Sequence, residues 1–236
     1  MRYDNKVYAH KLSLKNNYIY VNDDRREWMS IEERIIRAKI VLLGEPAVGK
    51  TTITKRFLGK GFSQVYKPTI GAEFYVKNFS LVDQVSGKEY QVQFLIWDIA
   101  GHEHFARIRK LYFKGTLGAL ILYDVTRPQT FYAVPNWIQE LLTYSGRFVP
   151  FVLVGNKIDL RTKNPSGCVM TSQGAEYAKI LSNFFKYPIL FIETSAKTGE
   201  NVEKAFAYLA QSIINFMRYI KPVSYTHLTL PTTERV

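Results

Sequence analysis

The sequence has almost no cysteine: Cys168 is the single cysteine in a chain of 236 residues. One thiol cannot form an internal disulfide, which excludes the disulfide-stapled class of secreted domains and indicates a reducing compartment. No uninterrupted apolar run approaches the roughly 20 residues that a membrane-spanning helix needs. The first residues also lack the apolar core of a secretory signal. These absences predict a cytoplasmic protein, with the cytosolic face of membranes as a second expected location.

Dense runs of one charge are missing as well. The 32 Lys and Arg residues exceed the 20 Asp and Glu residues and give a net charge of +12, but the basic residues are scattered along the chain. We therefore expect a solvated basic surface and no nucleic-acid partner, with weak attraction to acidic lipid as the alternative. Hydrophobic residues make up 47% of the chain, enough for one sizeable packed domain.

Through the middle of the chain, apolar runs of strand length alternate with longer segments of helical spacing. Strands are predicted at Ala38–Leu43, Glu73–Val82, Glu89–Ile96, Thr116–Tyr123, Pro150–Val154 and Pro188–Ile192. Helices are predicted at Thr51–Leu58 and near Phe131–Tyr144, Ser172–Phe185 and Asn201–Met217. This alternation predicts an α/β fold with a doubly wound, mostly parallel sheet flanked by helices. Ligands of such sheets bind at the carboxyl ends of the strands.

The two ends of the chain do not show this pattern. Residues 1–36 are expected to be an N-terminal extension, either a misassigned start upstream of Met29 or a disordered segment. Residues 221–236 are expected to be a tail outside the domain. Their sequence resembles translated vector or adapter DNA, which would mean that the native C-terminus is missing. The globular domain is therefore expected to span residues 37–220.

A phosphate-binding motif follows the first predicted strand. It matches the pattern G-x-x-x-x-G-K-[ST] and consists of Gly44, Glu45, Pro46, Ala47, Val48, Gly49, Lys50 and Thr51. Its glycines let the backbone turn tightly, so that N–H groups surround phosphates at the start of a helix. We expect Lys50 to bridge the β- and γ-phosphates and Thr51 to hold Mg²⁺, with Thr52 beside them in the nucleotide-binding set. The alternative, a glycine-rich turn with a surface lysine, is disfavoured by the strand–loop–helix context.

Two further motifs indicate that the bound base is guanine. The first directly follows an apolar strand and consists of Asn156, Lys157, Ile158 and Asp159. A carboxylate at Asp159 can accept both N–H donors of the guanine edge, which adenine lacks, and the Lys157 stem can cover one face of the base. The second follows the last strand, can offer a backbone N–H to guanine O6, and includes Ser195, Ala196 and Lys197. Taken singly, the two motifs are also compatible with a polar turn and a strand-to-helix cap.

Candidate ligands of Mg²⁺ and of a γ-phosphate lie on two more loops. Asp98, at the end of the third strand, would reach Mg²⁺ through water, and the Gly101 N–H would sense the γ-phosphate. Thr69 is placed to close on Mg²⁺ when the third phosphate is present, and Phe62 could stack edge-on against the base. Asp98 could instead cap a helix, and Thr69 and Phe62 could be ordinary loop residues. The residues alone leave these alternatives open.

In this order, the motifs resemble those of the Ras superfamily and most closely those of the Rab family. The resemblance runs from about Ala38 to Met217 and includes WDIAGHEHF, YFKGTLGALILYDVT and FIETSAKTGENVEKAF. It implies a P-loop NTPase G domain with a six-stranded sheet that binds GTP or GDP with Mg²⁺. It also implies two nucleotide-sensing switches, near Phe62–Gly71 and Gly101–Tyr112. We expect the protein to be a monomer.

The resemblance further implies protein partners. Phe74, Trp97 and Tyr112 match an aromatic triad that Rab proteins present to effectors, although spacing alone is equally compatible with core or sheet aromatics. An exchange factor and a GTPase-activating protein are expected, and membrane association would follow from a lipidated native C-terminus. The end of the given sequence lacks the cysteines that Rab proteins use for prenyl attachment. Because residues 221–236 are expected not to be the native end, this absence says nothing about lipidation.

Two departures from the family pattern concern hydrolysis. His102 stands where the family usually carries the glutamine that orients the attacking water; a histidine can also position water, or it can merely be tolerated while hydrolysis is slow. Pro46 and Ala47 replace small glycines, and Pro46 has no N–H to offer a phosphate. Because Gly49, Lys50 and Thr51 are intact, nucleotide binding is expected to survive.

The sequence as a whole therefore predicts a GTP-hydrolysing molecular switch in membrane traffic or signalling, with slow intrinsic turnover. Its expected catalytic set is Lys50, Thr69, Gly101 and His102. The alternative suggested by His102 and Pro46 is a GTP-binding scaffold with little hydrolysis. A metabolic P-loop ATPase or kinase is a third reading, disfavoured by the N-K-I-D motif and by the absence of an arginine-rich lid.

Overall fold

The computed structural model describes residues 14–15, 18–20, 28–30, 35–61, 69, 71–101, 106–163 and 167–219. At its centre is a six-stranded sheet with the strand order β5-β6-β4-β7-β8-β9. These strands are β4 (Ile35–Leu43), β5 (Ala72–Val82), β6 (Glu89–Ile99), β7 (Gly118–Asp124), β8 (Phe151–Asn156) and β9 (Leu190–Thr194). In this sheet β5 and β6 pair antiparallel and every other pair is parallel, which confirms the predicted sheet.

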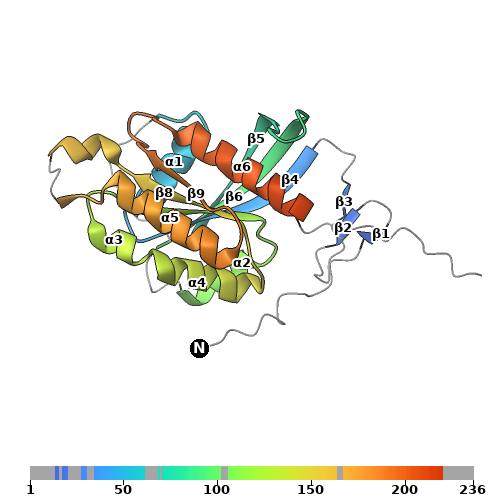
Figure 1. The fold of residues 1–236 in the computed structure, drawn as a ribbon, viewed down its shortest axis with the longest axis horizontal. Helices are drawn as coiled ribbons and strands as arrows, with labels where there is room; N and C mark the ends of the chain where they lie inside the picture. The colour runs from blue at the N-terminus through green and yellow to red at the C-terminus, as the bar shows by residue number, and fades with distance from the viewer. Residues whose placement is uncertain are drawn as a thin grey trace, which may run out of the picture.

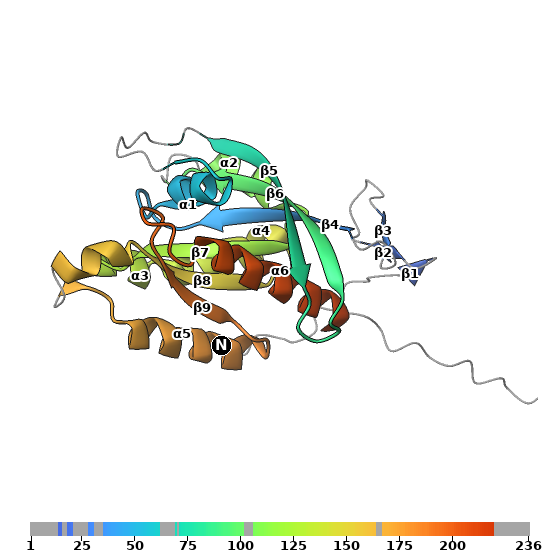
Figure 2. The same cartoon turned by 90° about the horizontal axis from the view of Figure 1, so that it is seen from above.

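Helices cover both faces of this sheet, as Figures 1 and 2 show. One face is covered by α1 (Lys50–Phe57) and α6 (Val202–Tyr219). The other face is covered by α2 (Ala106–Phe113), α3 (Pro128–Tyr132), α4 (Val134–Ser145) and α5 (Thr171–Phe185). Within the described residues, none of these helices is both long enough and apolar enough to traverse a bilayer.

The central strands are apolar on both faces because both faces are covered. In β4, Ile40 and Leu42 belong to the core beneath α1 and α6, whereas Val41 and Leu43 belong to the core on the opposite face. Every residue of β7 and β8 is buried. Such strands read as continuous apolar runs, which is why the sequence predicts them without an alternating pattern.

Short strands also occur near the N-terminus. β1 (Leu14–Lys15), β2 (Tyr18–Tyr20) and β3 (Trp28–Ser30) pair antiparallel in a three-stranded sheet of their own. They fall within the predicted extension, residues 1–36, and add nothing to the six-stranded sheet.

The predicted helices are found, with two differences. The single helix expected near Phe131–Tyr144 is in fact α3 and α4, separated at Ala133. Pro135 stands in the first turn of α4 and has no N–H to bond the carbonyl of Phe131, so one continuous helix cannot form there. Two further helices were not predicted from the sequence: α2 and the 3₁₀ helix η2 (Ile158–Lys163).

Candidate nucleotide-binding site

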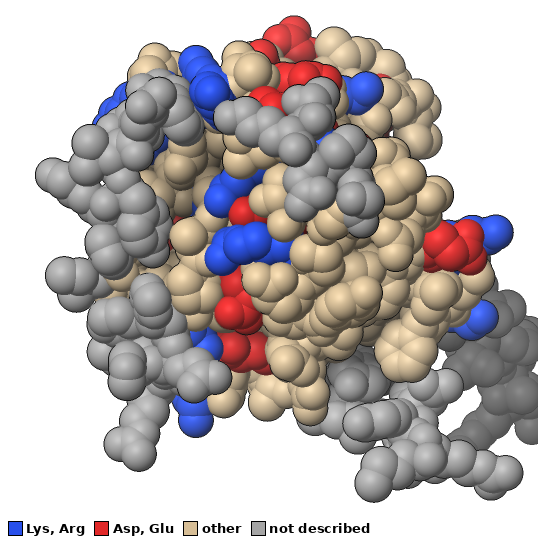
Figure 3. Space-filling view, turned by 90° about the vertical axis from the view of Figure 1, so that its left-hand side faces the viewer, with Lys and Arg blue, Asp and Glu red and all other residues tan. Residues whose placement is uncertain are grey.

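The predicted motifs converge because the parallel strands end at one edge of the sheet. The loops after β4, β6, β7, β8 and β9 all leave from this edge, which lies on the left in Figure 1. Figure 3 faces this side and shows Lys and Arg side chains interleaved with Asp and Glu side chains across its middle.

The phosphate-binding motif forms a tight loop between β4 and α1. Gly49 has φ of 104°, and a Cβ there would lie 2.2 Å from Asn156 Nδ2, so only glycine fits. Gly101 approaches the same loop closely, since its Cβ would lie 2.7 Å from Lys50 Nζ and 2.7 Å from the Gly44 carbonyl oxygen. The structure thus brings Gly101 against the phosphate-binding loop.

Lys50 is buried at the centre of this loop. Its ammonium donates to the carbonyl oxygens of Gly44, at 2.7 Å, and Glu45, at 3.0 Å. Burial lowers the pKa of Lys50 to about 8, against the attraction of Asp98 and Glu45. A buried cation with a lowered pKa is stabilised by an anion, because the anion replaces the hydration that the ammonium has lost.

Thr51, Thr69 and Asp98 meet beside Lys50. Thr51 Oγ1 donates to Asp98 Oδ2 and lies 3.0 Å from Thr69 Oγ1. Asp98 is fully buried in β6, where its carboxylate is bound by the Thr51 hydroxyl. Burial raises the pKa of the Asp98 carboxyl to about 6, although the Thr51 hydrogen bond and the Lys50 charge oppose this.

This oxygen cluster fits a hard divalent cation. Asp98 Oδ1 is buried and has no hydrogen-bond partner in the part of the chain that the structure describes. A cation would use that orphaned oxygen, directly or through water, together with the two hydroxyls. The described residues contain no group of three or more His, Cys, Asp or Glu side chains able to hold a metal. Phosphate and water oxygens would therefore have to complete the shell of an ion such as Mg²⁺.

The N-K-I-D motif ties the candidate base site to the phosphate-binding loop. Asn156 is buried; its Nδ2 donates to the Val48 carbonyl oxygen at 2.8 Å, and its Oδ1 accepts from the Ala196 N–H at 3.1 Å. Asp159 Oδ1 accepts from Ser195 Oγ at 2.6 Å. Asn156 thereby links the phosphate-binding loop to the loop that contains Ala196. In this structure the Ala196 N–H, from the run predicted to contact guanine O6, is engaged by Asn156.

Lys157 and Lys197 occupy the flanks of the candidate base site. Lys157 has a left-handed backbone, with φ of 69°, and its ammonium lies 2.8 Å from Asp124 Oδ2. The Lys197 carbonyl oxygen accepts from Arg56 Nη2, which anchors the loop to α1. Thr52 is half-buried in the first turn of α1. Two predicted residues, Phe62 and His102, lie outside the described residues.

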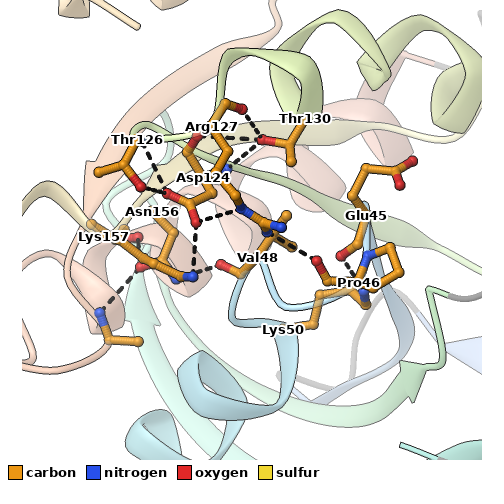
Figure 4. A network of polar contacts seen from close by, with 12 residues as sticks. Glu45, Pro46, Val48, Lys50, Asp124, Thr126, Arg127, Thr130, Asn156 and Lys157 are labelled. Atoms are coloured by element: carbon orange, nitrogen blue, oxygen red, sulfur yellow. Dashed lines mark hydrogen bonds and ion pairs between the residues drawn. The ribbon is translucent and has the colours of Figure 1, made fainter. Parts of the chain in front are cut away.

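Sequence reasoning missed two residues that contact the phosphate-binding loop, Trp137 and Arg127, and a third, Asp124, that holds Arg127. Trp137 Nε1 donates to Glu45 Oε1 at 3.1 Å. Arg127 Nη2 donates to the Pro46 carbonyl oxygen at 2.9 Å, and Asp124 Oδ2 binds Arg127 Nε at 3.0 Å (Figure 4). Asp124 directly follows the apolar run LGALILY, and Arg127 follows Asp124 after Val125 and Thr126. Their place at the carboxyl end of a buried strand was the available signal.

Comparison with known proteins decides the family. The family model described as the Ras family matches residues 39–215. The chain belongs to the Ras family. The Ras-related protein RABA5a of Arabidopsis thaliana is 38% identical over 76% of this chain and 74% of its own length. The Ras-related protein Rab11D of Nicotiana tabacum is 35% identical over 76% of this chain and 74% of its own length.

A yeast relative shows the same level of similarity. The GTP-binding protein YPT53 of Saccharomyces cerevisiae is 37% identical over 74% of this chain and 76% of its own length. These relatives place this Ras-family protein among the small GTPases close to Rab proteins, as the resemblance of its motifs implies. The fold of the described residues, with its six-stranded and mostly parallel sheet, is that of a P-loop GTPase.

The predicted aromatic triad forms one contiguous cluster on β5, β6 and α2. Ring centroids lie 5.1 Å apart for Phe74 and Trp97, and 5.0 Å apart for Trp97 and Tyr112. Phe74 is 49% exposed, whereas Trp97 and Tyr112 are partly buried against the core. The neighbouring Val76 is 48% exposed on the same strand. The cluster is therefore a half-exposed apolar surface that also contributes to the core.

Proposed function

We propose that this Ras-family protein is a molecular switch that binds and hydrolyses GTP with Mg²⁺. The observation that carries the proposal is the convergence of three groups at one sheet edge. A buried ammonium, Lys50, lies beside an oxygen cluster with an orphaned acceptor on Asp98. Asp159 lies in the first turn of η2, just after β8, and accepts a hydrogen bond from Ser195. These are the elements needed to hold phosphates, a cation and a guanine base.

Each residue would have a defined role in the reaction. Lys50 and the loop N–H groups would bind the phosphates and offset the charge that develops as water attacks the γ-phosphate in line. Thr51, Thr69 and Asp98 would hold Mg²⁺, which when bound neutralises charge on the β- and γ-phosphates. Asp159 would accept the guanine N–H donors, and Lys157 would cover the base.

The switch itself would depend on two residues that contact this centre from different loops. Thr69 lies 3.0 Å from Thr51 by their hydroxyl oxygens, and Gly101 lies against Lys50. A γ-phosphate would hold both residues, and its loss on hydrolysis would release them. Effectors would bind the ordered state, and an exchange factor and a GTPase-activating protein would control its lifetime. The process served would be membrane traffic or signalling.

The effector surface is tested by Phe74→Ala. Phe74 is half-exposed on the edge strand, so we expect its truncation to weaken effector binding at least tenfold while nucleotide affinity changes less than twofold. Binding to candidate effectors is measured with the protein loaded with a non-hydrolysable GTP analogue. Phe184→Ala, at an exposed position on α5, is the matched control. An effector that binds both variants equally well would assign Phe74 to the fold alone.

The role of His102 is tested by single-turnover hydrolysis. We expect His102→Ala to lower the GTP cleavage rate about tenfold or more, because a group that orients the attacking water is lost, while GDP affinity is retained. The assay compares wild type and variant after loading with GTP and adding Mg²⁺. Rates near background in both proteins, even with candidate activating proteins, would instead support the second function, a GTP-binding scaffold. Pro46, which lacks an N–H, is the observation that favours that alternative.

A further inference from the structure

The phosphate-binding loop is held from outside by side chains that bind its carbonyl groups. Arg127 Nη2 donates to the Pro46 carbonyl oxygen at 2.9 Å, and Asn156 Nδ2 donates to the Val48 carbonyl oxygen at 2.8 Å. Asn156 belongs to the N-K-I-D motif, but no motif includes Arg127. Figure 4 shows Arg127 extended between Asp124 and the loop.

The hydrogen bond from Arg127 to the Pro46 carbonyl oxygen also fixes the orientation of the Ala47 N–H group. The described residues contain no cis peptide bond, so the C=O of Pro46 and the N–H of Ala47 point in opposite directions from one planar unit. Arg127 binds the C=O, and this turns the N–H toward the other side of the loop. Ala47 has φ of 60°, an unfavourable value for alanine that surrounding contacts must maintain.

The orientation of this one N–H matters because the preceding residue has none. Pro46 offers no donor, so the tip of the loop has one N–H fewer than a loop with glycine there. Among the described residues, the Ala47 N–H donates to no other group. It is therefore available to an anion held inside the loop.

Arg127 is itself held in position by neighbouring residues of the chain. It is the N-cap residue of α3; its N–H donates to the Asp124 carbonyl oxygen, and its own carbonyl oxygen accepts from the Thr130 N–H, both at 2.9 Å. Its Nε lies 3.0 Å from Asp124 Oδ2, and that carboxyl is almost completely buried. Burial alone would raise the pKa of Asp124, but hydrogen bonds from Lys157 and Thr126 hold it below its ordinary value, so the carboxylate stays charged.

We propose that Arg127 is a positioning residue of the phosphate-binding loop, which fixes the Pro46–Ala47 peptide so that the Ala47 N–H faces the phosphates of a guanosine diphosphate and slows its release. This inference rests on the proposed function, because it requires that the loop holds a nucleotide. It assigns to Arg127 a role in nucleotide retention and none in contacting the base.

The first test reads the Ala47 N–H directly. In the GDP-bound wild type with Mg²⁺, we expect its proton resonance to lie far downfield, as for an N–H that donates to a charged acceptor. In Arg127→Ala that resonance moves upfield, and GDP dissociates about tenfold faster. The control is Arg37→Ala, which removes the same charge at an exposed position of β4 and leaves both readouts unchanged.

The second test separates the phosphate side of the site from the base side. Arg127→Ala should lower the affinity for GDP about tenfold but the affinity for GMP less than twofold, because the two ligands share the base and only GDP carries a β-phosphate for the Ala47 N–H. Equal losses for GDP and GMP would place the effect on the base, through Asp124 and Lys157, and would overturn the inference. So would an unchanged Ala47 resonance together with an unchanged release rate. A wild-type protein that binds neither nucleotide would overturn the proposed function itself.

Discussion

Asp159→Asn is expected to exchange the base preference of the protein. The affinity for GDP should fall by about 10³-fold or more, and xanthosine diphosphate should become the better ligand. Guanine presents two N–H donors to a carboxylate, and an amide replaces one acceptor oxygen with a donor NH₂. Xanthine carries a carbonyl where guanine carries its amino group, so the amide donor has a partner again.

The hydrogen bond from Ser195 indicates which way we expect the new amide to point. Ser195 Oγ donates to Asp159 Oδ1 at 2.6 Å, so an asparagine would keep its oxygen toward Ser195 and turn its NH₂ toward the base. The experiment measures the affinities for GDP and xanthosine diphosphate by competition for both proteins. Glu176→Gln, which removes one negative charge from the exposed surface of α5, should leave the GDP preference intact. A variant that keeps the wild-type preference would remove Asp159 from the base site.

Lys50→Ala should abolish tight nucleotide binding. We expect at least a 100-fold loss of GDP affinity, because a charge-assisted contact with the phosphates is lost from a buried position. Its ammonium also binds the Gly44 and Glu45 carbonyl oxygens, so the loop loses an internal support as well. Both effects act in the same direction.

The measurement for Lys50→Ala is GDP binding by calorimetry, with circular dichroism to show that the variant is folded. Lys179→Ala removes an exposed lysine from α5 and serves as the matched charge control. The control should bind GDP like the wild type. A folded Lys50→Ala protein with GDP affinity within threefold of wild type would show that the phosphates lie elsewhere.

The strands could be predicted because burial on both faces leaves a plain signal in the sequence. β7 and β8 are wholly buried and read as continuous apolar runs. Helix boundaries depend on single backbone hydrogen bonds. Pro135 has no N–H to donate, and it divides α3 from α4. The α2 segment was interpreted from the family resemblance as part of a nucleotide-sensing switch, and its helical character was missed.

The motifs predicted that the candidate loops lie at one edge of the sheet, as they do in the structure, but the motifs did not reveal how these loops contact one another. Asn156 and Val48 are 108 positions apart, and Arg127 and Pro46 are 81 positions apart. Such pairs are brought together by the strand order, which local spacing does not encode. The chemistry of each loop could therefore be predicted one by one, whereas the network that links them required the fold.

We propose above all that one site holds a guanine base at Asp159 and phosphates at Lys50. It is tested most directly by loading the protein with fluorescent GDP in Mg²⁺ and displacing the label with GTP or with ATP. We predict complete displacement by GTP at near-stoichiometric concentrations and none by ATP at about a 1,000-fold excess. Equal displacement by the two nucleotides, or a failure to bind the label at all, would contradict the account.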